Sequence, residues 1–437
     1  MAITTLFIFR MRLSGRTIMK RNYLIVLLVL VTFFVISFIT NLLAPIFPAL
    51  IQSYNIGLTL AGFFPFAFFI AYGVMSIPAG LLVQSLGEKK VMLIAFSLAL
   101  FGSVLFVSLP IFAVAMSALF LIGTAMALLQ VAINPLLRAS GGSKHFAVFS
   151  VAAQLMFGGA ATLSPLVYSA LVKADSQAQS QNWLLQLVPA DLTWLSMYLL
   201  FALLCTVMLV VISVLPIKHN TQAENPQQGS IKQSLQLFKD PTVIKFFFAI
   251  VAYVALEQGV ANSISVFLQT YHQLDPNTGG AQIVSQFWLS LTLGCLLGIV
   301  LLKLFDAKHV LLTFSVGAVV SLFTALFAHT ELALWAFPAV GFFLSIMWSV
   351  IFSLALNSVA KGHGTVSGIL CTGIVGGAFA SPIIGAVSEL TGSLQISLLL
   401  LLIPLGYIFS VGIWANPLVA NHTLKSNPQT AKLAESN

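Results

Sequence analysis

Charged side chains are scarce in this sequence. Its 437 residues include 19 Lys and Arg and 11 Asp and Glu, so that only 7% are charged. A soluble domain carries about 25% charged residues, and this composition therefore excludes a soluble enzyme and a nucleic-acid binder. The sequence is instead 59% hydrophobic and contains 36 Phe, as expected for helices that face lipid. These numbers predict a polytopic membrane protein.

The sequence also has little that could build a metal or cofactor site. Its three cysteines, Cys205, Cys295 and Cys371, lie far apart in apolar runs without CxxC spacing, which argues against a disulfide framework or a metal cluster. The seven histidines fall at or beyond the ends of predicted helices and form no cluster at metal-ligand spacing. The sequence contains no Walker element or Gly-rich phosphate loop. We therefore expect no metal, no cofactor and no step driven by ATP.

Long charge-free intervals are the main feature that the sequence does have. A membrane-spanning helix needs about 20 apolar residues, so the intervals 22–87 and 91–137 each hold two helices, divided at residues 54–57 and at Pro110. The same pattern along the rest of the chain predicts an all-α membrane protein with twelve spanning helices. They are expected near residues 23–51, 58–83, 91–109, 111–137, 146–172, 193–215, 241–271, 280–304, 309–329, 332–359, 364–389 and 393–414.

A polar stretch divides these helices into two sets of six. If the N-terminus is cytoplasmic, every Lys and Arg except Lys173 falls on the cytoplasmic side, as the positive-inside rule favours. The net charge of +8 then reflects orientation in an inner membrane, with both termini in the cytoplasm. The expected parts are a tail at 1–22, a half at 23–217, a linker at 218–240, a half at 241–414 and a tail at 415–437.

Residues 1–18 do not fit this pattern. An apolar patch is followed by Arg10, Arg12 and Arg16, without a small-residue cleavage site. We expect residues 1–18 to be a disordered extension, or a segment that does not belong to the native protein. The alternative is an interfacial amphipathic segment.

The chain repeats itself at an offset of 218 residues. This offset aligns residues 80–93 with residues 298–311, and it aligns residues 158–160 with residues 376–378, both Gly-Gly-Ala. Two similar six-helix halves joined by a polar linker are a transporter architecture, in which the substrate binds between the halves near the middle of the membrane. The repeated glycines could alternatively serve only to let neighbouring helices pack closely.

The repeated loop resembles the G-x-L-x-D-R-x-G-R-K signature of the major facilitator superfamily. Its first copy, in which Gln84 stands where the signature has an acid, fits at Gly80, Leu82, Gly87, Lys89 and Lys90. The second copy carries Asp306 and Lys308. The resemblance implies that these loops take part in a conformational change, and we expect helices to close against each other at Gly80 and Gly298.

Several segments resemble, more narrowly, the fucose–galactose–glucose:H+ symporter family. Ala44 stands where that family has an acid in its first helix, and Phe157 stands where it has an amide in its fifth. The resemblance implies a sugar transporter coupled to a proton, while these departures leave the sugar and the ion open. The matching segments are residues 38–50 (FITNLLAPIFPAL), 130–135 (QVAINP), 253–257 (YVALE), 345–355 (SIMWSVIFSLA) and 374–378 (IVGGA).

Glu257 is the only acid or base that falls well inside a predicted span. A charge at the centre of a bilayer costs at least about 2.5–3.5 kcal/mol, so this carboxyl needs a partner or a proton. Burial favours the neutral form of a carboxyl group, which suits a site whose proton or cation occupancy changes during transport. The alternative is a neutral carboxyl that only steadies the fold by bonding between helices. We expect Glu257 to carry cation coupling, by H+ or Na+.

Five uncharged side chains are predicted to contact the substrate: Gln130, Asn134, Gln154, Asn262 and Trp348. Gln130 and Asn134 lie four residues apart, on one face of a helix, and amides can both donate to and accept from sugar hydroxyls. Trp348 could stack against a sugar ring. The amides could instead bond between helices, and most aromatic residues of such a chain contact lipid or neighbouring helices. Asn41 is expected nearer the outer end, as a gate or a solvated residue.

The resemblance and these residues predict a secondary active transporter that imports a neutral monosaccharide by H+ symport and alternating access. The sugar would be a hexose, deoxyhexose or N-acetylhexosamine, bound between the halves against helices one, four, five, seven, eight, ten and eleven. An exporter of drugs or metabolites with the same fold, or a non-transporting membrane sensor, is the alternative. The expected partners are the sugar, H+ or Na+ and the lipid bilayer, and we expect a monomer that is not an enzyme.

Overall fold

A computed structural model describes residues 23–141, 146–176, 183–216, 239–359 and 363–418. These residues form helices and no strand, and twelve helical segments among them are long and apolar enough to cross a membrane. The predicted all-α fold with twelve spanning helices is therefore confirmed, and each span lies within a few residues of its expected place. Residues 1–18, nearly all of the expected linker and most of the C-terminal tail lie outside the described residues.

The N-terminal half contains the first six spans, and the first of these is divided into two helices. Short helical turns, α8 (Trp183–Gln186) and η2 (Ala190–Leu192), precede the sixth span. The spans are α2 (Tyr23–Thr40) with α3 (Leu43–Tyr54), α4 (Leu58–Leu86), α5 (Glu88–Ser108), α6 (Phe112–Gly141), α7 (Phe146–Ser176) and α9 (Leu195–Val214).

The C-terminal half contains the other six spans, several of which are built from more than one helical segment. They are α11 (Pro241–His272), η3 (Pro276–Gly280) with α12 (Ala281–Leu304), α13 (Ala307–Phe327), α14 (Thr330–Leu344) with α15 (Met347–Asn357), α16 (His363–Thr372) with η4 (Gly373–Val375) and α17 (Gly376–Thr391), and α18 (Leu394–Leu399) with α19 (Leu402–Trp414).

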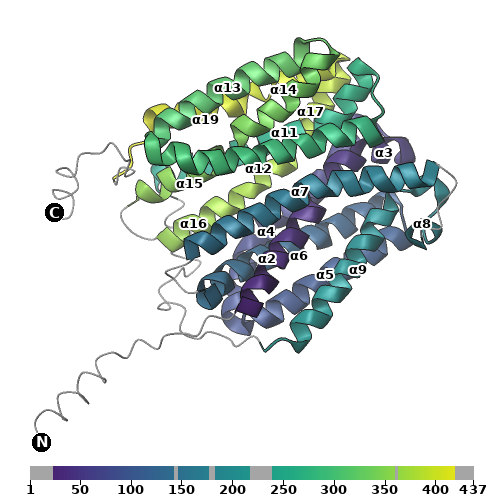
Figure 1. Ribbon diagram of the computed structural model, residues 1–437, viewed down its shortest axis with the longest axis horizontal. Helices are drawn as coiled ribbons and strands as arrows, with labels where there is room; N and C mark the ends of the chain where they lie inside the picture. The colour runs from purple at the N-terminus through teal and green to yellow at the C-terminus, as the bar shows by residue number, and fades with distance from the viewer. Residues whose placement is uncertain (1–22, 142–145, 177–182, 217–238, 360–362, 419–437) are drawn as a thin grey trace, which may run out of the picture.

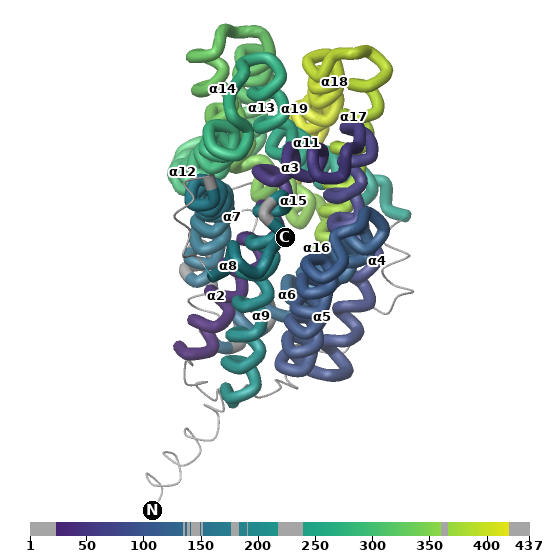
Figure 2. Tube along the Cα trace, turned by 90° about the vertical axis from the view of Figure 1, so that its right-hand side faces the viewer, coloured from purple at the N-terminus to yellow at the C-terminus, as the bar shows by residue number. Residues whose placement is uncertain are grey.

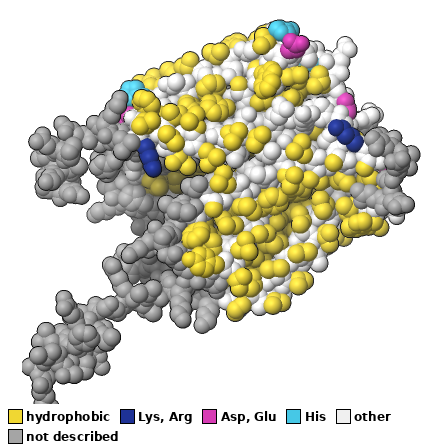
Figure 3. Space-filling view, viewed as in Figure 1, with side chains coloured by type: hydrophobic (Ala, Val, Ile, Leu, Met, Phe, Trp, Pro, Cys, Tyr) yellow, Lys and Arg dark blue, Asp and Glu magenta, His cyan; other side chains and the backbone are white. Residues whose placement is uncertain are grey.

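The two halves are separate helical bundles that lie side by side. Figure 1 shows the N-terminal half, purple to teal, below the C-terminal half, green to yellow, and Figure 2 shows the same division from another side. The first span begins and the last span ends at one face, on the left of Figure 1, which we call the terminal face. The opposite face is called the distal face below. On the side seen in Figure 3 the charged side chains lie near these two faces, and the flank between them is largely apolar.

A proline explains why the first span is broken. The ring of a proline inside a helix clashes with the carbonyl four residues earlier and removes one backbone hydrogen bond. Pro45 places that clash at Asn41, and the turn between α2 and α3 falls at Asn41 and Leu42. The tenth span has a comparable turn at Ser345, between α14 and α15. Both breaks place side chains near the middle of the molecule, between the halves.

The halves touch closely toward the distal face. Helix α4 packs against α17 and α7 packs against α12, so each contact joins one half to the other. A Cβ atom added to Gly62 of α4 would lie 2.5 Å from the backbone nitrogen of Pro382 in α17. A Cβ atom on Gly385 would lie 2.6 Å from the carbonyl oxygen of Leu58. Only glycine permits this close approach of the two backbones.

Candidate functional site

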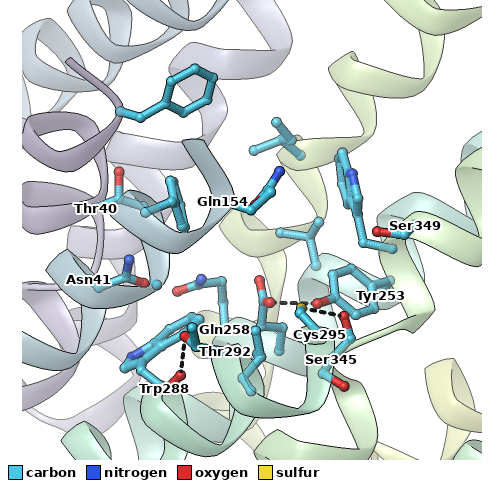
Figure 4. A pocket seen from close by; sticks show the side chains of 18 of the residues that line it. Thr40, Asn41, Gln154, Tyr253, Gln258, Trp288, Thr292, Cys295, Ser345 and Ser349 are labelled. Atoms are coloured by element: carbon cyan, nitrogen blue, oxygen red, sulfur yellow. Dashed lines mark hydrogen bonds between the residues drawn. The ribbon is translucent and has the colours of Figure 1, made fainter. Parts of the chain in front are cut away.

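A cavity of about 360 Å³ lies between the two halves. Both halves line it, through α2, α4, α6 and α7 on one side and α11, α12, α15 and η4 on the other. The seven spans that were expected to contact the substrate all contribute side chains. The second span adds Phe69 and Tyr72, which the sequence did not predict. The polar and aromatic groups of the cavity are shown in Figure 4.

The N-terminal half supplies amide side chains to the cavity wall. Gln130 on α6 is half-buried and Gln154 on α7 is exposed, and both line the cavity. Asn134 lies one turn after Gln130 on α6, but its side chain is outside the described part of the structure. Thr40 lines the cavity too, although its hydroxyl donates to the carbonyl of Ile36, 2.8 Å away.

Asn41 is buried at the break of the first span, so that, of the two expected alternatives, a gate or a solvated residue, the solvated one is wrong. Its side chain is 2% exposed, and its amide nitrogen donates to the carbonyl and the hydroxyl oxygens of Ser37, both 3.0 Å away. The hydroxyl of Ser37 in turn donates to the carbonyl of Phe157, 2.6 Å away. These bonds fix the amide, and its Oδ1 has no hydrogen-bond partner among the described residues. Asn41 therefore lines the cavity with a buried acceptor beside it.

The C-terminal half supplies the acid. Glu257 on α11 lines the cavity half-buried, and its Oε1 accepts a hydrogen bond from the hydroxyl of Tyr253, 2.6 Å away (Figure 4). Among the described lining residues Glu257 is the only Asp, Glu, Lys, Arg or His. The carboxyl therefore faces the cavity without a basic partner from its lining. The described residues contain no group of three His, Cys, Asp or Glu that could hold a metal ion.

Aromatic rings form the wall next to this acid. Trp348 on α15 is half-buried, and its ring centroid lies 6.0 Å from that of Tyr253 and 6.0 Å from that of Phe352. Trp348 lines the cavity, and its contact with a substrate stays a prediction. An offset of 218 residues pairs it with Gln130 of the other half, so equivalent places in the two halves carry an amide and an aromatic ring.

Asn262 does not line the cavity. It is 2% exposed, and its amide nitrogen donates to the hydroxyl of Ser381 on α17, 3.2 Å away. Asn262 lies five residues after Glu257, which is about 140° around the helix, so its side chain points away from the cavity toward α17. Asn262 was predicted to contact substrate, and the structure corrects this: its amide joins α11 to α17 by a hydrogen bond.

Several lining residues were not predicted from the sequence. Gln258 is 5% exposed and directly follows Glu257. Trp288, Thr292 and Cys295 lie on successive turns of α12, and the thiol of Cys295 donates to the carbonyl of Ser345, 3.1 Å away. The spacing of residues 288, 292 and 295 fits one helix face, but nothing in an apolar sequence showed which face was directed inward.

The predicted conformational loops have different surroundings in the two halves. A Cβ atom on Gly298 would lie 2.2 Å from the side chain of Ile346, whereas one on Gly80 would meet no atom within 4 Å. Gly80 lies within α4, near its terminal-face end, and Gly87 has a φ of 82° between α4 and α5. Gly298 thus packs against its own half whereas Gly80 has open space, and the closing of helices at these two loops stays a prediction.

Lysines hold the loops to neighbouring helix ends. Lys89 donates to the carbonyls of Ser213 and Leu215 at the end of α9, and Lys308 donates to those of Ile413 and Ala415 at the end of α19. Asp306 caps α13 by accepting a hydrogen bond from the backbone of Lys308. Lys90 is exposed. Lys308 thus corresponds to Lys89, and the alignment with Lys90 was wrong by one residue.

The chain is similar to known sugar transporters over most of its length. It is 28% identical over 411 residues to a glucose/galactose transporter of Brucella abortus biovar 1 (strain 9-941), covering 92% of this chain and 96% of the relative. It is 23% identical over 396 residues to the L-fucose-proton symporter of Escherichia coli (strain K12), covering 86% of this chain and 89% of the relative. These matches confirm the narrower resemblance seen in the sequence.

Solved structures support the same fold. A crystal structure of the E. coli fucose:proton symporter FucP matches with a TM-score of 0.64 and 19% identity, over 90% of this chain and 98% of that one. The family model of the Major Facilitator Superfamily matches residues 29–382. This match runs from the first span into the eleventh, and the chain belongs to the major facilitator superfamily.

Proposed function

We propose that this protein imports a neutral monosaccharide together with H+ across a cell inner membrane, by alternating access. The relatives reported above are named as a glucose/galactose transporter and an L-fucose-proton symporter. The cavity has the size and the mainly apolar wall of a small-molecule site, with a few polar groups that fix the ligand. The observation that carries the proposal is Glu257, an acid in the cavity wall without a facing base among the described residues.

The polar groups of the cavity suit a ligand with hydroxyl groups. Gln130 and Gln154 can donate and accept, while the free acceptor of Asn41 can bind a donor. A hydroxyl both donates and accepts, so one kind of ligand group satisfies all three. Trp348 offers an aromatic face to the C–H side of a sugar ring. We propose these four residues as sugar contacts.

Protonation of Glu257 would link the ion to the movement of the halves. Closing the cavity on both sides removes water from the carboxyl, and an unpaired buried charge is costly. A proton removes that cost, so the loaded transporter can close while the ionised one is held open to water. The same reasoning permits Na+ as a partner of the carboxylate, and the choice of H+ follows the name of the fucose relative.

The conformation of the chain supports alternating access. Among the lining residues, Asn41 and Trp288 are buried and stand in the distal part of their spans, whereas Gln154 and Ser349 are exposed and stand near the terminal ends of theirs. The cavity is thus closed at the distal end and reached from the terminal end. By the positive-inside rule we expect the terminal face in the cytoplasm, and we propose that this is the inward-facing state.

A sugar panel tests the proposal. Purified protein is heated with glucose, galactose, L-fucose or N-acetylglucosamine, because a ligand that binds only the folded state raises the unfolding temperature. Uptake of the stabilising sugar is then measured in vesicles under an inward H+ gradient or an inward Na+ gradient. We expect one or more sugars to stabilise the protein and to accumulate under the H+ gradient. Absence of stabilisation and exchange for every sugar would contradict the substrate class, and accumulation under Na+ alone would contradict the ion.

A further inference from the structure

The carboxyl of Glu257 accepts a hydrogen bond from a tyrosine of its own helix, and the neighbouring Gln258 also bonds to it. Tyr253 lies one turn earlier on α11, and its hydroxyl donates to Oε1 of Glu257 over 2.6 Å. Tyr253 is 3% exposed, whereas Glu257 is half-buried and borders the cavity. The tyrosine hydroxyl therefore approaches the acid from the protein side and leaves the carboxyl open to the cavity.

The tyrosine ring has little freedom to move. Its centroid lies 6.0 Å from that of Trp348, with 59° between the two planes. Trp348 is stacked in turn on Phe352 at 23°. These rings pack the tyrosine from α15 and support the direction of its hydroxyl, toward Glu257. A fixed donor orients a carboxyl better than a mobile one, since less rotational freedom is lost when the bond forms.

Few other groups that can carry charge face this acid. Among the described residues that line the cavity, the titratable ones besides Glu257 are Tyr253 on α11, Cys295 on α12 and Tyr72 on α4, across the cavity. The thiol of Cys295 donates to the carbonyl of Ser345. None of these groups is a base that would pair with the ionised carboxylate. Among these lining residues, therefore, no ion pair with a base competes with the hydrogen bond from Tyr253.

We propose that Tyr253 is the positioning residue of the coupling site, whose hydroxyl sets the pH at which Glu257 releases its proton to the cavity. The inference rests on the proposed function, in which Glu257 carries the coupled proton. A hydrogen bond to an ionised acceptor is stronger than one to a neutral acceptor, so the hydroxyl stabilises the carboxylate that remains after release. The proton passes from the carboxyl of Glu257 to water of the cavity, and Tyr253 keeps its own proton throughout.

Tyr253→Phe tests this role with little change in shape. The substitution keeps the ring and removes the donor, so the ionised carboxylate loses stabilisation and Glu257 keeps its proton to higher pH. We expect the pH midpoint of sugar counterflow to move upward by about one pH unit. Tyr407→Phe is the matched control, because the hydroxyl of Tyr407 also donates one hydrogen bond, to the carbonyl of Lys245 over 3.0 Å, away from the cavity. Its midpoint should equal that of the unmodified protein.

A double variant separates positioning from packing. Glu257→Gln cannot titrate, so adding Tyr253→Phe to it should leave its pH profile unchanged. An unshifted midpoint in Tyr253→Phe, with normal protein yield, would overturn the inference while leaving the proposed function intact. An equal shift in the presence and absence of Glu257 would overturn it as well. If the unmodified protein shows no sugar counterflow at any pH, the proposed function itself fails.

Discussion

Glu389 of the C-terminal half accepts two hydrogen bonds from the start of α4 in the N-terminal half. Its Oε1 accepts from the backbone nitrogen of Thr59 over 3.0 Å, and its Oε2 accepts from the hydroxyl of the same residue over 2.6 Å. A carboxylate at the first turn of a helix also meets the positive end of the helix dipole. A second link joins the halves at the distal face, where the hydroxyl of Tyr168 donates to Oδ1 of Asn277 over 2.6 Å. At the distal end, polar contacts therefore join the halves in addition to the packing of α4 on α17 and of α7 on α12.

Glu389→Ala is expected to shift the protein toward opening at the distal face. The lost bonds are exposed, so together they are worth about 1 kcal/mol, or about fivefold in the ratio of the two states. The measurement is the distance between spin labels at Gln52 and Leu390, both exposed near the distal face, in a background without native cysteines. Glu331→Ala removes another exposed acid at this face and should leave the distance unchanged. Equal distances in both variants would show that Glu389 does not hold the distal end.

Two glycines of α4 should have opposite effects when each is replaced by Leu. Gly62 touches the backbone of α17, so a side chain there blocks closure at the distal face, whereas Gly80 has open space in this conformation. We expect Gly62→Leu to lengthen the distal label distance. Gly80→Leu should preserve the closed distal face and instead prevent the terminal face from closing. Both variants should therefore lose sugar accumulation, for opposite reasons. A lengthened distal distance in Gly80→Leu would contradict this account.

The two glutamines of the N-terminal half should set the affinity for sugar. Each of Gln130→Ala and Gln154→Ala removes hydrogen bonds worth about 0.5–1.5 kcal/mol, which weakens binding roughly 2- to 13-fold. Isothermal titration with the sugar found in the panel gives the dissociation constant. Gln395→Ala is the matched control, since the amide of Gln395 donates to the carbonyl of Leu326 outside the cavity. Unchanged affinity in both cavity variants would mean that this wall is structural.

The spans could be predicted because their signal is long and strong. A charge-free run of about 20 residues has few alternatives to a membrane helix, and a single acid in such a run, Glu257, is easy to find. The direction of each side chain could not be predicted in the same way. Asn262 and Gln258 lie on the same apolar helix, and no polar face distinguishes the one that reaches the cavity from the one that bonds Ser381.

The surroundings of equivalent residues in the two halves could not be predicted from the sequence either. Gly80 and Gly298 occupy matching positions in the repeat, yet one has open space and the other is packed against Ile346. Ile346 belongs to the same half as Gly298, so this contact comes from the packing inside the C-terminal half, which the repeat alone does not determine. The one-residue shift between Lys89 and Lys308 became visible only from their shared role at helix ends.

Sugar accumulation by Glu257→Gln in vesicles tests the central claim most directly. Glutamine resembles the protonated acid in shape and hydrogen bonding but cannot change its proton occupancy. The variant is therefore expected to bind sugar and to exchange labelled for unlabelled sugar across the membrane. Under an inward H+ gradient it should bring the internal sugar only to the external concentration, whereas the unmodified protein accumulates sugar above it. Accumulation by Glu257→Gln under the same gradient would contradict the account, because the coupled proton would then be carried elsewhere.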